Sequence, residues 1–578
     1  MAKDFGKNRN QATVVTVSNA PRVLRNAIGG KDRADFLRFT LPVSSSFQAN
    51  LSKLKANADL ALLNSAGQVI GQSKRKGKRN EAITLPLQAG SYFLRITPGN
   101  AQDQTKYRLR LLAVPTVPAV PTNTAPLLAT NSPLSLPKGT TAIFNGTQLK
   151  ATDLEQNPSQ LTYTVTRLPE SGLLQLSGTR LAVGNTFTQT DIDTGRLSYS
   201  GLGRNQRLTN NNEFDTAPQV SGLNAVWSGV GGSDRGVDEE IFFFNGTTVT
   251  QLTTNGTLDL EPQISGNNVV WFGAGGSDGG VDEEIFFFNG TTVTQLTTNN
   301  TGEFYPQVSG NNIVWLGIGG SDGGTDTELF FFNGTTVTQL TSNSNDDGFP
   351  EISGSNITWS SVGGSDGGTD TELFFFNGTT VTQLTTNNTP DINSRISGNN
   401  VVWYGRGGSD GGADNEIFFF NGSTVTQLTT NNTDDIDPQI SGNNVVWAGR
   451  GGSDGGVDTE IFFFNGAIVT QLTTNNTFDS RPEISGTNIA WFGAGGSDGG
   501  TDTEIFFFNG STVSQLTSNM FDDFPVQISG SNLIWRSFFS SGNPEIFLSN
   551  MATNDSFGFT LADGAGGVTN GMFNLNLV

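Results

Sequence analysis

Residues 306–341, PQVSGNNIVWLGIGGSDGGTDTELFFFNGTTVTQLT, hold four strand-length runs separated by turn signals. The Asn333-Gly334 pair favours a tight hairpin between the last two runs, because both central residues of that turn need positive φ. The same unit recurs around eight tryptophans spaced 44 residues apart: Trp227, Trp271, Trp315, Trp359, Trp403, Trp447, Trp491 and Trp535. Four short antiparallel strands repeated every about 40–45 residues are typical of propeller blades. The sequence therefore predicts an all-β fold in which residues 203–550 form an eight-bladed β-propeller.

The two ends of the repeat array predict how the ring closes. Gln251-Leu252-Thr253 ends the first blade, and Arg207-Leu208-Thr209 stands in the same register 44 residues earlier. Because an unpaired outer edge leaves backbone groups unsatisfied, residues 205–210 are expected to supply the fourth strand of the last blade. The Phe-rich third strand, residues 241–244 in the first blade, is apolar on both faces and is therefore expected between neighbouring blades.

The order of motifs resembles the TolB-type propeller repeat over residues 205–550. Gln-Leu-Thr is followed by an Asn-rich loop, a Pro-x-Ile/Val-Ser-Gly stretch and an apolar strand that ends in Trp. The Asp-Gly turn of that family is Gly-Asn-Asn here. The resemblance implies the fold and carries over no catalytic residue, since the lyases and peptidases among TolB-like propellers rely on His, which this chain lacks.

Two small β-sandwich domains are expected before the propeller. Residues 33–113 contain DFLRFTL at 35–41 and LQAGSYFLRI at 87–96, which resemble the bacterial pre-peptidase C-terminal domain. That family flanks secreted enzymes and includes calcium and matrix-polymer binders, but its acidic calcium ligands are not evident in this sequence. Residues 1–32 are interpreted as an N-terminal extension. The basic run at 74–79 is either a solvated hairpin loop or a site for anionic glycan, nucleic acid or the acidic ring.

A linker and a second sandwich follow. Residues 114–126 carry Pro115, Pro118 and Pro121, which predict a semi-rigid polyproline spacer. Residues 127–202 include FTQTDIDTGRLSY, which is similar to the cadherin-like chondroitin-sulfate-proteoglycan repeat. That resemblance implies an extracellular spacer, here a stalk between the first sandwich and the ring.

The absence of two residue types narrows the chemistry. The chain has no His and no Cys, which excludes Ser-His-Asp and Cys-His relays and zinc sites built from imidazole or thiolate. Any metal must be held by oxygen, which favours calcium. No run of about 18 apolar residues is present, so no membrane span is expected.

Seven repeats carry a loop of the form Ser-Asp-x-Gly-x-Asp-x-Glu between their second and third strands, and the eighth keeps just the glutamate, Glu545. The candidate metal ligands are the paired aspartates of these loops: Asp234, Asp238, Asp278, Asp282, Asp322, Asp326, Asp366, Asp370, Asp410, Asp414, Asp454, Asp458, Asp498 and Asp502. Two carboxylates on a Gly-containing loop, with backbone carbonyls, supply the oxygen ligands of calcium. Asp and Gly are also ordinary turn formers, so a solvated loop without metal is the alternative.

Charge predicts the kind of partner. The chain has a net charge of −21 and no lysine after Lys150. The loops after the second and fourth strands of a blade emerge on one face, and both are acidic, so that face is expected to attract cations and basic partners and to repel nucleic acid. The loop carboxylates recur as near-identical copies, and no blade is expected to carry singular polar residues in the tunnel.

These observations predict an extracellular binding, adhesion or scaffold protein that is not an enzyme, with a protein or polymer ligand and an oligomeric state left open. The alternative is a secreted glycan-active lyase or hydrolase that uses propeller carboxylates. Residues 551–578 end in FNLNLV, which resembles uncleaved C-terminal signals of bacterial type I secretion. They are interpreted as a mobile or secretion tail of a secreted or cell-surface bacterial protein, with a final strand as the alternative.

Overall fold

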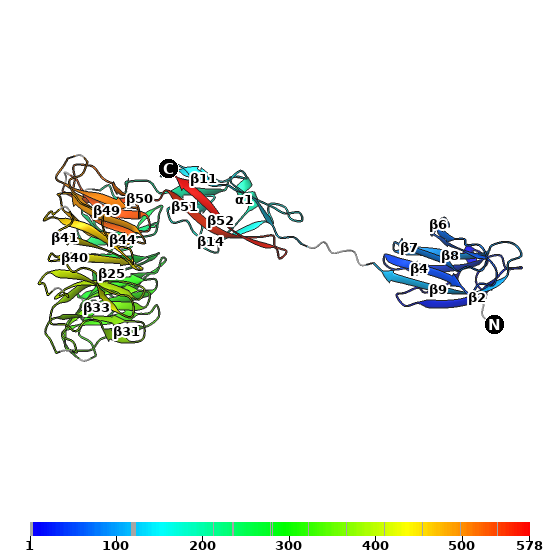
Figure 1. Cartoon of the computed structure of the whole chain (residues 1–578), viewed down its shortest axis with the longest axis horizontal. Helices are drawn as coiled ribbons and strands as arrows, with labels where there is room; N and C mark the ends of the chain where they lie inside the picture. Colours follow the sequence, from blue (N-terminus) through cyan, green and yellow to red (C-terminus); the bar gives the residue numbers. More distant parts are fainter. Residues whose placement is uncertain are drawn as a thin grey trace. The chain divides into compact units, whose positions relative to one another are not determined.

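The structure is a computed structural model that describes every residue except 1–3, 117–122, 212, 234, 235, 278, 280, 322, 366, 410, 454, 498, 540 and 541. The chain forms two compact units, Met1–Thr122 and Asn123–Val578. Described secondary structure is β apart from the 3-10 turn η1 (Arg9–Gln11) and the short helix α1 (Gln189–Asp193), which Figure 1 labels. The all-β prediction is confirmed.

The first unit is built from two sheets, with strand orders β1-β3-β8-β5-β6 and β2-β9-β4-β7. Its strands are β1 (Thr13–Val14), β2 (Arg22–Ile28), β3 (Asp35–Leu41), β4 (Ser45–Ser52), β5 (Ala58–Leu63), β6 (Val69–Ser73), β7 (Glu81–Leu87), β8 (Gly90–Pro98) and β9 (Thr105–Pro115). Alternating apolar residues of both sheets, Phe39 and Phe47 among them, form a common core. The expected separate extension at 1–32 is not observed, because β1 pairs with β3 and β2 pairs with β9 along its whole length.

The second unit begins with a small β-sandwich. It is formed by two segments that are far apart in the sequence. Its strands are β10 (Leu127–Asn131), β11 (Leu134–Leu136), β12 (Thr141–Ile143), β13 (Leu149–Thr152), β14 (Thr162–Arg167), β15 (Gly172–Leu176), β16 (Thr179–Arg180), β17 (Thr186–Thr188), β18 (Leu197–Gly201), β51 (Asn554–Ala562) and β52 (Val568–Leu577). They form sheets of order β11-β52-β51-β14-β17, β12-β18-β15-β16 and β10-β13.

Residues 551–578 are therefore not a tail. The β51–β52 hairpin pairs with β14 on one side and β11 on the other, and Figure 1 shows it in red beside β14. Phe559 and Phe573 are buried in the sandwich core with Tyr163. The physical reason is the alternation of apolar residues along both strands, which gives each a face that must be buried. The alternative of a final strand is the correct one.

Seven four-stranded antiparallel sheets follow in series, consistent with propeller blades, and an eighth has the order β19-β50-β49-β48. The first strands are β20 (Asp215–Ser221), β24 (Asp259–Ser265), β28 (Glu303–Ser309), β32 (Asp347–Ser353), β36 (Asp391–Ser397), β40 (Asp435–Ser441), β44 (Asp479–Ser485) and β48 (Asp523–Ser529). The second strands are β21 (Asn224–Val230), β25 (Asn268–Ala274), β29 (Asn312–Ile318), β33 (Asn356–Val362), β37 (Asn400–Arg406), β41 (Asn444–Arg450), β45 (Asn488–Ala494) and β49 (Asn532–Phe538).

The third and fourth strands form the outer half of each sheet, and the third strand is the Phe-rich one. The third strands are β22 (Glu239–Phe244), β26 (Glu283–Phe288), β30 (Thr327–Phe332), β34 (Thr371–Phe376), β38 (Asn415–Phe420), β42 (Thr459–Phe464), β46 (Thr503–Phe508) and β50 (Pro544–Asn550). The fourth strands are β23 (Val249–Gln251), β27 (Val293–Gln295), β31 (Val337–Gln339), β35 (Val381–Gln383), β39 (Val425–Gln427), β43 (Val469–Gln471), β47 (Val513–Gln515) and, for the eighth sheet, β19 (Gln206–Arg207).

The array closes on itself as the repeat register predicts. Strand β19 pairs antiparallel with β50, with Arg207 opposite Phe547. Each first strand contacts the first strand of the next sheet, and β48 contacts β20. The eight first strands therefore form the inner wall of a ring.

Aromatic packing joins neighbouring sheets. Within the first sheet Trp227 stacks on Phe242 at a centroid distance of 5.9 Å. On the other side of the third strand, Phe243 meets Phe288 of the next sheet edge-on at 5.6 Å. The prediction that the Phe-rich strand lies between blades is confirmed, since its residues are buried from both sides.

Candidate functional site

The loops between the second and third strands of the first seven sheets, called the acidic loops below, meet the loops that lead into the next sheet. In the third sheet the backbone N–H of Thr327 donates to Asp346 Oδ1 at 3.1 Å. The two kinds of loop therefore share one face, as the up-and-down strand order predicts. The fourth strand fixes the start of each acidic loop, because Gln251 Oε1 accepts from the backbone N–H of Ser233 at 2.8 Å and the same bond recurs in all seven sheets.

Half of the predicted metal ligands can be located. The first aspartate of every pair lies outside the described residues: Asp234, Asp278, Asp322, Asp366, Asp410, Asp454 and Asp498. The second of every pair has a buried Oδ2 atom without a hydrogen-bond partner among the described residues: Asp238, Asp282, Asp326, Asp370, Asp414, Asp458 and Asp502. A buried carboxylate oxygen without a partner is costly unless a cation or a donor satisfies it.

A glutamate stands two residues after each of these aspartates. Asp238 lies in the bend just before β22, and Glu240 is the second residue of that strand. Glu240 is 1% exposed, and its counterparts are equally buried: Glu284, Glu328, Glu372, Glu416, Glu460 and Glu504. In the fourth sheet Thr385 Oγ1 donates to Glu372 Oε2.

Each first strand also begins with a buried acid that faces the preceding sheet. Asp259 accepts from Trp271 Nε1 at 2.8 Å and from Asn255 Nδ2 at 2.8 Å. Burial, with a further contribution from the charge of Asp238, raises the pKa of Asp259 to about 6. Burial likewise raises the pKa of Glu303 well above its usual range, and Glu284 of the preceding sheet adds to the shift.

We call these three acids the boundary site, for example Asp238 and Glu240 of one sheet and Asp259 of the next; within the described part of the chain, they do not bring one oxygen of each to within 4.8 Å of the others. Sequence reasoning identified the aspartate and noted the glutamate, but missed the acid at the start of the following first strand. Its signal was present, since an acid recurs at that position in all eight sheets: Asp215, Asp259, Glu303, Asp347, Asp391, Asp435, Asp479 and Asp523.

The eighth boundary is built differently. There the loop lacks both aspartates, and the position of Gln251 is taken by Arg207. Arg207 Nη2 lies 2.6 Å from Glu545 Oε1. Thr209 Oγ1 donates to Glu545 Oε2 at 2.6 Å, and the guanidinium lies 4.9 Å from the ring centroid of Phe539. An internal cation thus neutralises the buried glutamate at the boundary without the acidic loop.

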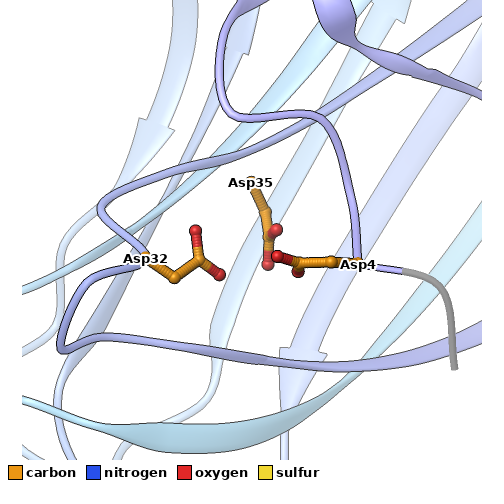
Figure 2. Close-up of side chains that lie close together, drawn as sticks. All are labelled: Asp4, Asp32 and Asp35. Carbon is orange, nitrogen blue, oxygen red and sulfur yellow. The ribbon is translucent and has the colours of Figure 1, made fainter. Parts of the chain in front are cut away.

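A separate acidic cluster lies in the first unit. Figure 2 shows Asp4, Asp32 and Asp35 with their carboxyl groups turned toward one another, and one oxygen of each lies within 4.8 Å of the others. Tyr107 Oη donates to Asp35 at 2.6 Å. Burial, with smaller contributions from Asp32 and Asp4, raises the pKa of Asp35 to about 7. The sequence interpretation found no evident acidic calcium ligands in this domain, and it placed Asp4 and Asp32 in a separate extension.

The first unit also carries a basic cavity. It has a volume of about 740 Å³ and is lined by Arg25, Lys53, Lys106 and Arg108. The predicted basic run at 74–79 lies elsewhere, in the mostly exposed connection between β6 and β7. The anion-attracting cavity of this unit is therefore formed by β2, β9 and the end of β4, not by that loop.

Comparison with known proteins identifies one region of the chain. Residues 126–215 match the cadherin-like family. The chain is 38% identical over 71 residues to human chondroitin sulfate proteoglycan 4, which covers 12% of this chain and 3% of that protein. It is 29% identical over 184 residues to extracellular matrix protein 3 of Lytechinus variegatus, covering 30% of this chain and 6% of that protein. The chain thus spans a small part of these relatives.

Solved structures also match parts of the chain at low sequence identity. The propeller domain of the trilobed protease from Pyrococcus furiosus covers 53% of this chain and 98% of its own, with 10% identity and a TM-score of 0.38. TolB from Acinetobacter baumannii covers 46% and 59%, with 14% identity and a TM-score of 0.25. The pre-peptidase C-terminal domain of Bacillus anthracis collagenase covers 17% and 92%, with 12% identity and a TM-score of 0.15. In the described part of the chain, no helix has the length and apolarity needed to cross a membrane.

Proposed function

We propose that this protein is an extracellular binding or adhesion protein in which a cadherin-like sandwich carries an eight-bladed, calcium-stabilised propeller. The cadherin-like match supports the extracellular location, because the relatives include an extracellular matrix protein. Each of the first seven boundary sites would hold one calcium ion through the loop aspartates and the glutamate of the third strand. Oxygen ligands from several carboxylates are what calcium takes in proteins.

One observation carries the calcium proposal. The eighth boundary lacks the loop aspartates and has Arg207 against Glu545, while the other seven have the aspartates and a glutamine in place of the arginine. A buried carboxylate needs a compensating positive charge. Arginine is therefore found at the boundary where the loop aspartates are missing, and glutamine where they are present. This pattern is expected if a bound cation supplies the positive charge at seven boundaries and a side chain supplies it at the eighth.

Converting one boundary into the other type tests this proposal. The triple variant Asp234→Asn, Asp238→Asn, Gln251→Arg should bind one calcium fewer by titration calorimetry and should lose little thermal stability, because arginine replaces the ion. The double variant without Gln251→Arg should bind one calcium fewer and also melt earlier. Glu213→Gln, at an exposed position before β20, is the matched control and should change neither value. Equal calcium uptake by all four proteins, or none by the parent, would refute the proposal.

The acidic face also defines the expected partner. The acidic loops lie on the same face as the loops that connect one sheet to the next, which also carry acids. This face is therefore expected to attract cationic groups after its calcium sites are filled. A basic protein surface or polymer is therefore proposed to bind it with an affinity that falls as salt is added. Salt-independent binding of such a partner would contradict this part of the proposal.

A further inference from the structure

The inner wall of the ring departs from the repeat. Every first strand starts with an acid and ends with serine, yet the third residue is different in each sheet. In order these residues are Ala217, Glu261, Tyr305, Phe349, Asn393, Asp437, Arg481 and Pro525. The expectation that no blade carries singular polar residues in the tunnel does not hold. The second residue of these strands varies as well, but the third is the position at which no two sheets share a residue, so it marks a place where the blades differ most.

The same residues sit in strained backbone. Seven of the eight have positive φ, from 45° at Arg481 to 57° at Asn393. Each lies in a shift of register between the first and second strands, between Phe304 and Gln307 in the third sheet. A bulge of this kind re-aims a side chain, and non-glycine residues at positive φ are held there at a cost of about 1–3 kcal/mol each. The repeat therefore sustains a costly geometry that presents one variable side chain per blade.

Polar side chains from three neighbouring blades line a cavity of about 320 Å³. Its lining residues are Asn393, Arg395, Asp437, Gln439, Arg481, Pro482 and Glu483. Glu483 Oε1 accepts from Gln439 at 3.2 Å and from Gln527 at 3.1 Å. Arg395 pairs with Glu351 at 3.1 Å. The cavity thus holds two guanidinium groups, two carboxylates and two amides, so its formal charges cancel.

Aromatic side chains occupy the adjoining part of the wall. Tyr305 and Phe349 are 44% and 64% exposed, and their rings lie 6.1 Å apart at 39°. They line a second cavity of about 340 Å³ that reaches Ile392, the neighbour of Asn393 in the polar cavity. Two exposed rings on one surface are a large apolar area to leave in water.

We propose that these two cavities, which meet in the chain at Ile392 and Asn393, bind a neutral oligosaccharide. Sugar hydroxyls are donors and acceptors, and planar amide, carboxylate and guanidinium groups can hold them in pairs. The apolar faces of sugar rings pack on exposed aromatic rings, which Tyr305 and Phe349 supply. Balanced charge in the polar cavity favours an uncharged ligand over an anionic one. This inference deepens the proposed binding function and does not depend on calcium.

Calorimetry of the full chain in calcium buffer with maltohexaose, cellohexaose, xylohexaose and chitohexaose tests it. At least one sugar should bind with a Kd below about 1 mM. Tyr305→Ala and Arg481→Gln should each weaken that binding about tenfold or more while the melting temperature changes little, because both side chains are exposed. Ile468→Ala, at an exposed hairpin of the sixth sheet, is the control and should bind as the parent does.

Two outcomes would overturn the inference: no measurable binding of any of the four sugars, or binding that Tyr305→Ala and Arg481→Gln leave unchanged. The inference would also be overturned if a basic or acidic hexapeptide bound the protein and both variants weakened that binding, while neither variant weakened the binding of the sugars. Calcium uptake measured on the same samples separates this failure from failure of the boundary sites. Unchanged calcium uptake with no sugar bound would reject the sugar site alone.

Discussion

Arg207 and Glu545 form a 2.6 Å ion pair that joins the strand preceding the first full blade to the third strand of the last. Glu545 has 3% of its side chain exposed and Arg207 has 36%. The pair has two roles in our account. It links the two ends of the repeat array across the β19–β50 pairing, and it places at the eighth boundary the positive charge that we propose calcium supplies at the other seven.

Removing this internal cation should destabilise the ring. Arg207→Gln leaves Glu545 buried without its positive partner, which should lower the free energy of unfolding by about 2–3 kcal/mol, less than for a fully buried pair because Arg207 is partly exposed. Denaturant unfolding measures this. Glu170→Gln, which removes the exposed pair with Arg167, should change stability by less than about 0.5 kcal/mol. A similar effect of both variants would contradict the role given to Arg207.

The C-terminal hairpin should be essential to the cadherin-like sandwich. Phe559→Ala opens a cavity in a core that holds Tyr163 and Phe187, so it should cost about 3–5 kcal/mol. Met572→Ala on the neighbouring strand is the control, because Met572 is 50% exposed. Deleting residues 551–578 should make residues 123–202 sensitive to limited proteolysis. Unchanged protease resistance after the deletion would show that the sandwich folds without β51 and β52.

Stability without calcium should fall as pH rises. Burial raises the pKa of Asp259, Asp391 and Asp435 to about 6 and that of Asp215 to about 7. Acids whose folded pKa exceeds the unfolded value near 4 favour the folded state in their protonated form. The contribution is complete below about pH 4 and is lost as pH rises through about 6–7. In EDTA the melting temperature should therefore drop between about pH 4 and 7, and calcium should reduce that drop.

Asp35 of the first unit should titrate near neutrality. Its pKa of about 7 reflects burial first and then the charges of Asp32 and Asp4, while the hydrogen bond from Tyr107 opposes the shift. Asp32→Asn should therefore lower the pKa of Asp35, and Tyr107→Phe should raise it, both measured by carboxyl carbon NMR on the compact unit of residues 1–122. Shifts of the Asp35 pKa in the opposite directions would contradict the effects assigned here to the charge of Asp32 and to the hydrogen bond from Tyr107.

Local pattern was sufficient for most of the fold. The 44-residue spacing, the Asn-Gly hairpins and the alternation in β3 all predict elements that the structure contains. Long-range pairing was harder to predict. β51 and β52 carry a clear strand pattern, but nothing local says that they pair with β14 and β11, which lie several hundred residues earlier.

The candidate sites show the same limit. The motif Asp-x-Glu places one acid just before the third strand and one at its second residue, and that much is readable from the sequence. The charge of Asp238 acts on Asp259 because the next sheet packs against the first, which no local motif states. The singular residues of the inner wall are visible in the sequence as a variable position of the repeat, but the meeting of three of them, Asn393, Asp437 and Arg481, at one cavity depends on how neighbouring sheets pack.

The most direct test of the central claim is an anomalous difference map from crystals grown with calcium chloride. We predict one peak at each of the first seven boundary sites, near Asp238 and Glu240 and their counterparts, and no peak at the eighth, where Arg207 contacts Glu545. An eighth boundary with the same peak as the others, or seven boundary sites without any peak, would contradict the account.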